Sequence, residues 1–271
     1  MAAPRQSTLL LVALQFLTRL PLPPLPQFEA GWLAQSLRYF PLVGAGVGLL
    51  NAGVLWLASK AFPMGVAVGL MLALSLLITG AFHEDGLADT CDGFGGARTR
   101  ERTLAIMQDS RIGAFGALGL IIVMGLKWTT LTALPPVWLP FGLVTAHTFS
   151  RWCALGLIWA LPYARAGGEG KAQPFASGLS ARGWMLSGLI AVPVPMAVAR
   201  WGLPAAEMPA ALPLAAGALV AALIVCLGLG AYFRRRIGGY TGDCLGAAQQ
   251  LAELTILLVM LGAVLPAARP G

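Results

Sequence analysis

Residues 83–98 read His-Glu-Asp-Gly-Leu-Ala-Asp-Thr-Cys-Asp-Gly-Phe-Gly-Gly-Ala-Arg, and Asp109-Ser110-Arg111 follows soon after. The chain of 271 residues contains 11 acidic residues, and six of them lie between positions 84 and 109. The sequence on both sides of this stretch is mostly apolar. A chain so poor in charge has little reason to crowd its carboxylates unless they act together. This stretch is therefore the candidate functional centre around which the rest of the fold is arranged.

The acidic residues in this stretch have helical spacing. Asp85, Asp89 and Asp92 stand at positions i, i+4 and i+7, which places them within a roughly 60° arc of a helix. Like charges at this spacing weaken a helix by about 0.2–0.5 kcal/mol per pair unless a cation offsets them. Carboxylate oxygens suit Mg²⁺, which often shares its coordination shell with water and phosphate. The stripe therefore predicts a magnesium site.

Glycines and arginines follow the acidic stripe. Gly93, Gly95 and Gly96 are expected to end the helix or to let a backbone approach a ligand closely. Arg98 and Arg111 come next, and guanidinium groups suit phosphate oxygens. Acids, glycines and arginines together are the composition of a metal-assisted phosphate site. The alternative is a solvated loop between membrane helices, which has no need of aspartates at helical spacing.

The composition is that of an integral membrane protein. Hydrophobic residues make up 58% of the chain, charged residues 11%, and the mean hydropathy is +0.77. A soluble domain has about 25% charged residues. We find no linker, repeat or low-complexity tract, so residues 1–271 are expected to form one domain. The four cysteines lie far apart, which favours reduced thiols without disulfides. The net charge of +7 comes mostly from loops, which indicates contact with membrane lipids and no nucleic-acid partner.

The expected fold is an all-α bundle of about seven transmembrane helices, with six to eight as the range. Each expected span is close to the ~20 residues that a bilayer requires. The spans are predicted at residues 41–59, 62–82, 114–134, 136–161, 183–203, 210–233 and 251–267. Residues 7–20 are a shorter apolar run, which we interpret as an interfacial or re-entrant helix, with a short membrane span as the alternative.

The positions of lysine and arginine predict the topology. Thirteen of the 18 lie in the N-terminal region or in loops on its side of the membrane, and three lie on the opposite side. The positive-inside rule then puts the N-terminus and the acidic glycine-rich segment in the cytoplasm and the C-terminus outside. We therefore expect a multi-pass protein of the bacterial cytoplasmic (inner) membrane, with its active site facing the cytoplasm.

Several ionisable residues fall within the expected spans. His147 and Arg151 stand at i and i+4 and are either functional groups or a paired structural site that faces the bundle interior. Lys127 is expected to have a structural role, and it could extend toward the membrane surface if its span is shifted along the sequence. Glu253 either supports the functional site or has only a structural role.

A second glycine-rich segment, residues 238–246, is predicted to lie on the same side of the membrane as the first. Its Asp243 either joins the metal or phosphate site or caps a helix as the N-cap residue. In the preceding loop on that side, Arg165, Lys171 and the segment 167–170 either contact substrate phosphate or act as a positive-inside anchor.

The chain resembles the cobalamin synthase family, the adenosylcobinamide-GDP ribazoletransferases, at five places that follow one another in the expected order. They are Ala-Leu-Gln-Phe-Leu-Thr-Arg at 13–19, Tyr-Phe-Pro-Leu-Val-Gly at 39–44, the acidic core at 83–96, Met-Gln-Asp-Ser-Arg-Ile-Gly at 107–113 and Thr-Gly-Asp-Cys-Leu-Gly-Ala at 241–247. Cys91 and Cys244 stand where the family commonly has Ala and Thr, and neither change removes a candidate ligand.

The resemblance implies a late step of cobalamin (vitamin B12) biosynthesis. The family joins adenosylcobinamide-GDP to α-ribazole or its 5′-phosphate: a ribose hydroxyl attacks the phosphorus on the corrin side, GMP leaves, and Mg²⁺ is required. The protein partners that we consider are a second copy of the chain, in a homo-oligomer, and other enzymes of cobalamin assembly.

The site residues expected from these patterns fall into three groups. The catalytic candidates are His83, Asp85, Asp89 and Asp92; the metal ligands are Asp85, Asp89, Asp92 and Asp243; the substrate-binding candidates are Gly95, Gly96, Arg98, Asp109, Ser110, Arg111 and Gly242.

Two other functions are weighed against this one. The CDP-alcohol phosphotransferases carry an Asp-x-x-Asp-Gly-x-x-Ala-Arg pattern, which residues 89–98 echo with one extra residue before Ala97. A transporter or cation channel would line its path with the acids. Against this second alternative, the acids lie beside glycines and arginines, away from the expected membrane midplane.

Overall fold

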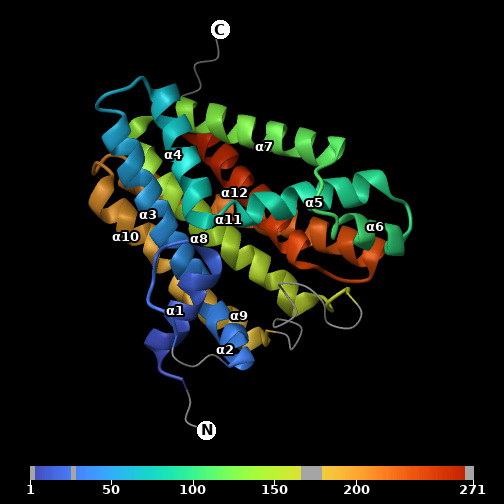
Figure 1. The fold of residues 1–271 in the computed structure, drawn as a ribbon. Coiled ribbons are helices and arrows are strands. Elements are labelled where there is room, and N and C mark those ends of the chain that lie inside the picture. The colour runs from blue at the N-terminus through green and yellow to red at the C-terminus, as the bar shows by residue number, and fades with distance from the viewer. Residues whose placement is uncertain (1–3, 26–28, 166–178, 266–271) are drawn as a thin grey trace.

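The computed structural model describes residues 4–25, 29–165 and 179–265, and these ranges are almost entirely helical (Figure 1). The helices are α1 (Gln6–Leu17), α2 (Ala30–Ser36), η1 (Leu37–Tyr39), α3 (Phe40–Ala58), α4 (Met64–Thr79), α5 (Phe82–Gly96), α6 (Arg100–Ile106), α7 (Ala114–Ala133), η2 (Pro136–Trp138), α8 (Leu139–Ala160), α9 (Ala181–Ala191), α10 (Pro193–Gly202), α11 (Met208–Ile237) and α12 (Gly242–Val264). The predicted all-α class is confirmed.

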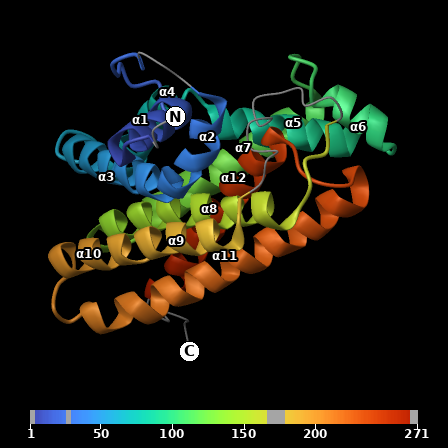
Figure 2. The ribbon, with the colours of Figure 1, turned by 90° about the horizontal axis from the view of Figure 1, so that it is seen from below.

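Helices α8 and α12 form the centre of the bundle. Helix α8 packs against α3, α9, α10, α11 and α12, and Figure 2 shows α8 running beside α9, α10 and α11. Helix α12 also packs against α5 and α7. The two central helices therefore connect the acidic helix α5 to the rest of the molecule.

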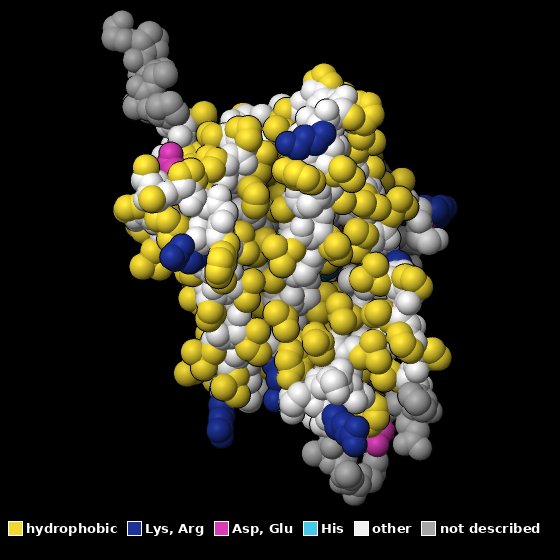
Figure 3. Space-filling view, turned by 90° about the vertical axis from the view of Figure 1, so that its left-hand side faces the viewer, with side chains coloured by type: hydrophobic (Ala, Val, Ile, Leu, Met, Phe, Trp, Pro, Cys, Tyr) yellow, Lys and Arg dark blue, Asp and Glu magenta, His cyan; other side chains and the backbone are white. Residues whose placement is uncertain are grey.

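The outer surface is apolar. Leu77, Leu189 and Leu227 are each at least 70% exposed, on α4, α9 and α11. Hydrophobic side chains cover most of the face in Figure 3, and only a few lysine and arginine side chains interrupt them. Soluble proteins rarely expose so much contiguous apolar area, whereas lipid tails accept it without cost. The protein is a multi-pass membrane protein.

Five helical segments in the described ranges are long and apolar enough to cross a membrane. They cover residues 31–58, 114–133, 181–202, 208–237 and 242–264, and a sixth is added if α4 and α5 count as one bent span. The expected span 136–161 forms α8, which has 22 residues but carries polar side chains and is enclosed by other helices. The expected span 183–203 is divided into α9 and α10 at Val192. The short run at 7–20 forms α1, which has 12 residues.

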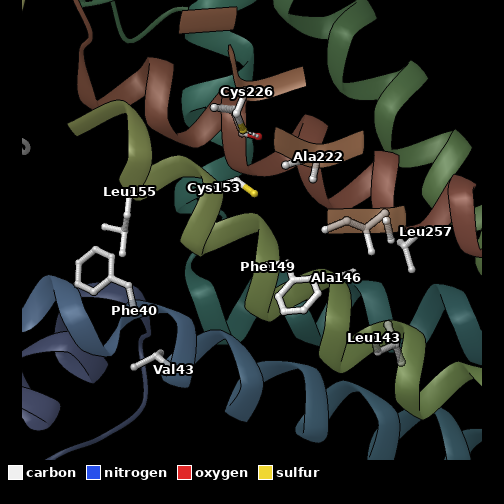
Figure 4. Close-up of a cluster of buried hydrophobic side chains, with 14 of the residues drawn as sticks. Phe40, Val43, Leu143, Ala146, Phe149, Cys153, Leu155, Ala222, Cys226 and Leu257 are labelled. Carbon is white, nitrogen blue, oxygen red and sulfur yellow. Dashed lines mark hydrogen bonds between the residues drawn. The ribbon is translucent and has the colours of Figure 1, made fainter. Parts of the chain in front are cut away.

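The apolar core lies where α3, α8, α11 and α12 meet, and Figure 4 shows part of it. The labelled side chains are Phe40, Val43, Leu143, Ala146, Phe149, Cys153, Leu155, Ala222, Cys226 and Leu257. Glycine allows the closest approach in this region. A Cβ added at Gly48 of α3 would lie 2.8 Å from the Cα of Val144, so α3 and α8 touch backbone to backbone. The described cysteines are all free thiols, as expected.

Helices α4 and α5 meet at an angle of 89°, and the bend lies at the end of the span that the sequence predicts at residues 62–82. Helix α4 ends at Thr79, and Gly80 and Ala81 then take left-handed conformations with φ of 65° and 53°. Such a φ is unusual for alanine and needs support from its surroundings. Arg19 supplies that support: its backbone N–H donates to the carbonyl of Ile78 at 2.6 Å, and its side chain lies against Gly80.

Helix α5 contains the whole acidic stripe. The early carboxylates Glu84 and Asp85 lie in its first turn, where the helix dipole favours negative charge. The helix ends at Gly96, the last of the three glycines that were expected to end it. Gly93 and Gly95 lie within the helix, where they leave room for the side chains of Met107 and Phe115, which pack against the helix backbone.

Candidate active site

A cavity of about 550 Å³ lies between α1, α3, α5, α8 and α12, and it brings together most of the predicted site residues. The predicted residues that line it are His83, Asp85, Asp89, Asp109, Ser110, Gly242 and Asp243. Residues outside that predicted set also line it, among them Phe16, Phe40, Phe82 and Gln249, together with Arg151 and Arg165, to which the sequence gives either a functional or a structural role. The cavity therefore has an acidic part, two arginines and an aromatic part.

The crossing of α5 and α12 sets the position of the acids. A Cβ added at Gly86 would lie 2.9 Å from the carbonyl oxygen of Asp243, and one added at Gly246 would lie 3.0 Å from the carbonyl oxygen of His83. The two helices therefore touch backbone to backbone. As a result, Asp243 lines the same cavity as Asp85 and Asp89, although more than 150 residues separate them in the chain.

The second glycine-rich segment is shorter than expected, because α12 begins at Gly242. Helix α11 ends at Ile237, where Gly238 takes a left-handed conformation with φ of 82°. Thr241 is the N-cap of α12, and its hydroxyl accepts a hydrogen bond from the Cys244 N–H at 3.3 Å. Asp243 is therefore not the cap, and it lies in the first turn of α12 with its side chain at the cavity.

Asp92 lies away from the cavity. Its two carboxylate oxygens accept hydrogen bonds from the backbone N–H groups of Gly113 at 2.7 Å and Gly116 at 2.8 Å, at the start of α7. Asp92 shares the helical arc of Asp85, as the spacing predicts, but seven residues separate the two by roughly 10 Å along the axis. This geometry favours a role for Asp92 in holding the N-terminus of α7, and disfavours its predicted role as a metal ligand.

Four predicted substrate-binding residues do not line the cavity. Gly95 packs against Phe115, Gly96 lies beside Ile106, Arg98 is exposed, and Arg111 is also exposed.

Arg111 pairs with Asp109 near the cavity. Its Nη2 lies 2.6 Å from a carboxylate oxygen of Asp109, and its Nε and backbone N–H also donate to this carboxylate. The hydrogen bonds from Arg111 lower the pKa of Asp109 to about 2. Asp109 is therefore ionised at physiological pH.

Two arginines reach the cavity from helices or loops outside the acidic stretch. Arg165 donates from Nη2 to Oδ2 of Asp243 at 2.7 Å. Arg151 of α8 is almost fully buried and lines the cavity as well. The sequence marks both residues as candidates, but it gives no sign that Arg165 pairs with Asp243. Lys171 and the segment 167–170 lie outside the described residues.

A buried polar network adjoins the cavity. Glu253 of α12 lies 2.7 Å from Nζ of Lys127 and 3.2 Å from Nδ1 of His147. Lys127 is only 2% exposed, so it does not extend to the membrane surface, and its place in this network is a structural one. Glu84 belongs to this network too, because its Oε1 accepts a hydrogen bond from Gln250 at 2.8 Å. The network explains how these charges are accommodated within the bundle.

The aromatic part of the cavity wall is formed by three phenylalanines from α1, α3 and α5. The Phe16 and Phe40 rings are stacked with centroids 5.7 Å apart, and the edge of Phe82 meets Phe16 at 5.4 Å. Such a wall suits a planar apolar group.

The carboxylates suit a magnesium ion that is held partly by its substrate. Among the described residues, no three carboxylate, imidazole or thiol side chains are close enough to form a ready-made metal site. Asp85 and Asp89 nevertheless share one wall of the cavity, and Asp243 lines it from α12. Mg²⁺ is commonly bound by one or two carboxylates, with water and phosphate completing its shell, so this set of oxygen donors fits the ion.

Comparison with known proteins identifies the family to which the chain belongs. The family model for cobalamin-5-phosphate synthase matches residues 9–261. The adenosylcobinamide-GDP ribazoletransferase of Leptothrix cholodnii is 45% identical, over 96% of this chain and 97% of that protein. The enzymes of the same name from Ralstonia pickettii and Shewanella baltica are 44% and 42% identical, over 92% and 95% of this chain and 93% and 95% of theirs. No solved structure matches the chain. The match over nearly the whole length means that the chain belongs to the cobalamin-5-phosphate synthase family.

Proposed function

We propose that the protein is an adenosylcobinamide-GDP ribazoletransferase, which joins adenosylcobinamide-GDP to α-ribazole or α-ribazole 5′-phosphate and releases GMP. In this reaction a ribose hydroxyl oxygen forms a bond to the phosphorus on the corrin side, and the bond from that phosphorus to the GMP oxygen breaks. Family membership supports this assignment. The observation that carries it is the cavity in which Asp85, Asp89 and Asp243 lie together with two arginines.

In this proposal Asp85 and Asp89, with Asp243 from α12, would hold Mg²⁺. When bound, the ion would neutralise the diphosphate and the negative charge that develops on the leaving GMP. Arg165 keeps Asp243 in place through their hydrogen bond. A carboxylate of the cavity or His83 takes the proton from the attacking hydroxyl.

The size and lining of the cavity suit the smaller substrate. Ligand pockets for small molecules have volumes of about 300–1,000 Å³, and this one has about 550 Å³. In the proposal the planar base of α-ribazole lies against Phe16, Phe40 and Phe82, with its ribose toward the acids. The corrin ring system of the other substrate is too large for this space, and only its diphosphate end enters.

The proposal also puts the protein in the bacterial cytoplasmic membrane, with the cavity open to the cytoplasm. Its basis is the unequal distribution of lysine and arginine between the two sides. Ser110 is exposed at the cavity, so a single Ser110→Cys variant tests the orientation. A membrane-impermeant thiol reagent should label that cysteine in inverted membrane vesicles and leave it unlabelled in intact spheroplasts. The opposite pattern would reverse the orientation.

The central experiment uses the purified protein in lipid with adenosylcobinamide-GDP, α-ribazole 5′-phosphate and Mg²⁺. We expect GMP release that requires both substrates and stops when EDTA removes the metal. Either release of GMP without an acceptor, or no release from a folded sample, would contradict the assignment. Persistence of the reaction in EDTA would contradict only the role of the metal.

A further inference from the structure

Arg151 is a buried cation whose role the acidic site does not explain. It lies on α8, is 3% exposed and lines the cavity. Its Nη1 donates to the carbonyl oxygen of His147 at 2.9 Å and lies 3.2 Å from Nδ1 of the same residue. Its Nε is buried and has no hydrogen-bond partner among the described residues. A buried donor without a partner carries a desolvation cost, and a ligand at this position would remove it.

The carboxylate nearest to Arg151 already has other partners. It is that of Glu253, whose Oε2 lies 3.8 Å from Nη1 of Arg151. The same carboxylate is bound by Lys127 at 2.7 Å and by Gln249 at 2.5 Å. Glu84 accepts a hydrogen bond from Gln250 through Oε1, whereas its Oε2 has no hydrogen-bond partner, and the described residues show no ion pair between Glu84 and Arg151. The charge of Arg151 is therefore only partly balanced inside the protein, and a buried cation in this state favours an anion in the adjoining space.

The guanidinium geometry indicates which anion suits this position. Because Nη1 is turned toward His147, the Nε edge of the group remains for a ligand. That edge offers two parallel N–H donors, which match two oxygens of a phosphate group. Arg165, the other arginine of the cavity, is already paired with Asp243 at 2.7 Å.

We propose that Arg151 is a substrate-binding residue that takes a phosphate group in the cavity, and that His147 and Glu253 are positioning residues that orient it. This inference rests on the proposed function for the identity of the substrate. The phosphate belongs either to the acceptor, as the 5′-phosphate of α-ribazole, or to the diphosphate of adenosylcobinamide-GDP. The chemistry of recognition is the same in both cases.

The experiment compares the wild-type protein with Arg151→Gln and Arg151→Lys in lipid. GMP release is measured with α-ribazole 5′-phosphate and, separately, with α-ribazole as acceptor, and each substrate is varied in turn. A charge-assisted pair lost from a binding site weakens binding by about tenfold or more. Arg151→Gln should therefore raise the KM of the substrate that carries the phosphate by at least about tenfold, with a smaller effect on kcat. The KM of Arg151→Lys should lie between those of Arg151→Gln and the wild type, because an ammonium group keeps the charge but lacks the two parallel N–H donors of a guanidinium group.

The pattern of KM values distinguishes the two sources of phosphate. A higher KM for α-ribazole 5′-phosphate with an unchanged KM for α-ribazole assigns Arg151 to the acceptor. A higher KM for adenosylcobinamide-GDP with either acceptor assigns it to the donor. Lys127→Gln is the matched control, because it disturbs the same buried network from outside the cavity. It should lower the thermal stability without changing the ratio of the KM values for the two acceptors.

A binding measurement without turnover separates this inference from the proposed function. Inorganic diphosphate without metal should raise the Tm of the wild-type protein and should not raise that of Arg151→Gln. This result stands even if no GMP is released. If Arg151→Gln does not fold, the same measurements are made on Arg151→Lys. We then expect a higher KM than in the wild type and a smaller rise in Tm when diphosphate is added. A folded variant with wild-type KM values for every substrate and a wild-type response to diphosphate would overturn the proposal.

Discussion

Single carboxylates in α5 have different roles, and Asp89 is the one that best tests the chemistry. Asp89→Asn keeps the size of the side chain but removes the charge that faces the cavity. We expect GMP release to fall by at least about 10²–10³-fold, because electrostatic stabilisation of the transition state is lost, while the protein still folds into membranes. The measurement is GMP release per folded molecule, with Glu101→Gln on the exposed surface of α6 as the control. An active Asp89→Asn enzyme would remove Asp89 from the site.

Asp92 should affect stability instead. Its carboxylate accepts hydrogen bonds from two N–H groups at the start of α7, so Asp92→Ala leaves both without their acceptor. We expect a loss of about 1–2 kcal/mol in stability, as for other helix-capping residues. The check is a lower Tm in detergent for Asp92→Ala than for the wild type. A Tm equal to that of the wild type would show that water satisfies these donors equally well.

At the scale of single residues, the sequence predicts the common face of Asp85, Asp89 and Asp92, because the face depends only on helical periodicity. It does not predict that Asp92 reaches another helix, because that depends on where α7 begins in space. The pairing of Arg165 with Asp243 cannot be predicted from the sequence either, since 77 residues lie between them in the chain and no local pattern connects them.

At the scale of helices, the crossing of α5 and α12 controls the geometry of the cavity. Gly86→Ala would place a methyl group 2.9 Å from the backbone oxygen of Asp243, which cannot move without shifting α12. We expect destabilisation of about 1–3 kcal/mol, the usual cost of overpacking, together with a loss of GMP release as the acids move apart. Gly46→Ala in α3 is the matched control, because an added methyl group there has no neighbour within 4 Å.

The Tm and GMP release of the two glycine variants are measured together. Gly46→Ala should keep wild-type activity and should not lower the Tm, since alanine is the better helix former. If Gly86→Ala behaves like Gly46→Ala, the close contact between α5 and α12 has no part in setting the site.

Helices α3, α4, α7, α8 and α11 are well predicted from the sequence, because each is a long apolar segment. The bend between α4 and α5 is not predicted. Residues 62–82 contain no charged side chain, and a Gly-Ala pair is compatible with a continuous helix, so the sequence gives no local signal for the left-handed conformation of Ala81. The support comes from Arg19, which is distant in the chain and shows its role only in the folded structure.

At the scale of the whole molecule, the buried network joins α7, α8 and α12 through Glu253. Glu253→Gln would leave Lys127 without its ionic partner in the bundle interior. Breaking one side of a buried ion pair costs about 3–5 kcal/mol, so we expect a marked fall in the amount of folded protein in membranes. The double variant Lys127→Met/Glu253→Gln should recover part of this loss, because it removes the unpaired charge.

The yield of folded protein in size-exclusion chromatography checks this coupling, with Glu101→Gln as an exposed acidic control. If the double variant is less stable than the two single variants predict by addition, the pair between Lys127 and Glu253 is not the main contribution of the network.

The order in which the helices are synthesised affects how the nascent chain inserts into the membrane. Lys127 and Arg151 leave the ribosome well before Glu253, which lies on the last helix that the structure describes. Until that helix arrives, two cations lack their carboxylate, and helices with uncompensated charge partition poorly into lipid. We therefore expect α7 and α8 to become stable in the membrane only when α12 joins them. A chain whose translation stops before residue 242 lacks Glu253, and we expect it to be degraded faster than the full chain.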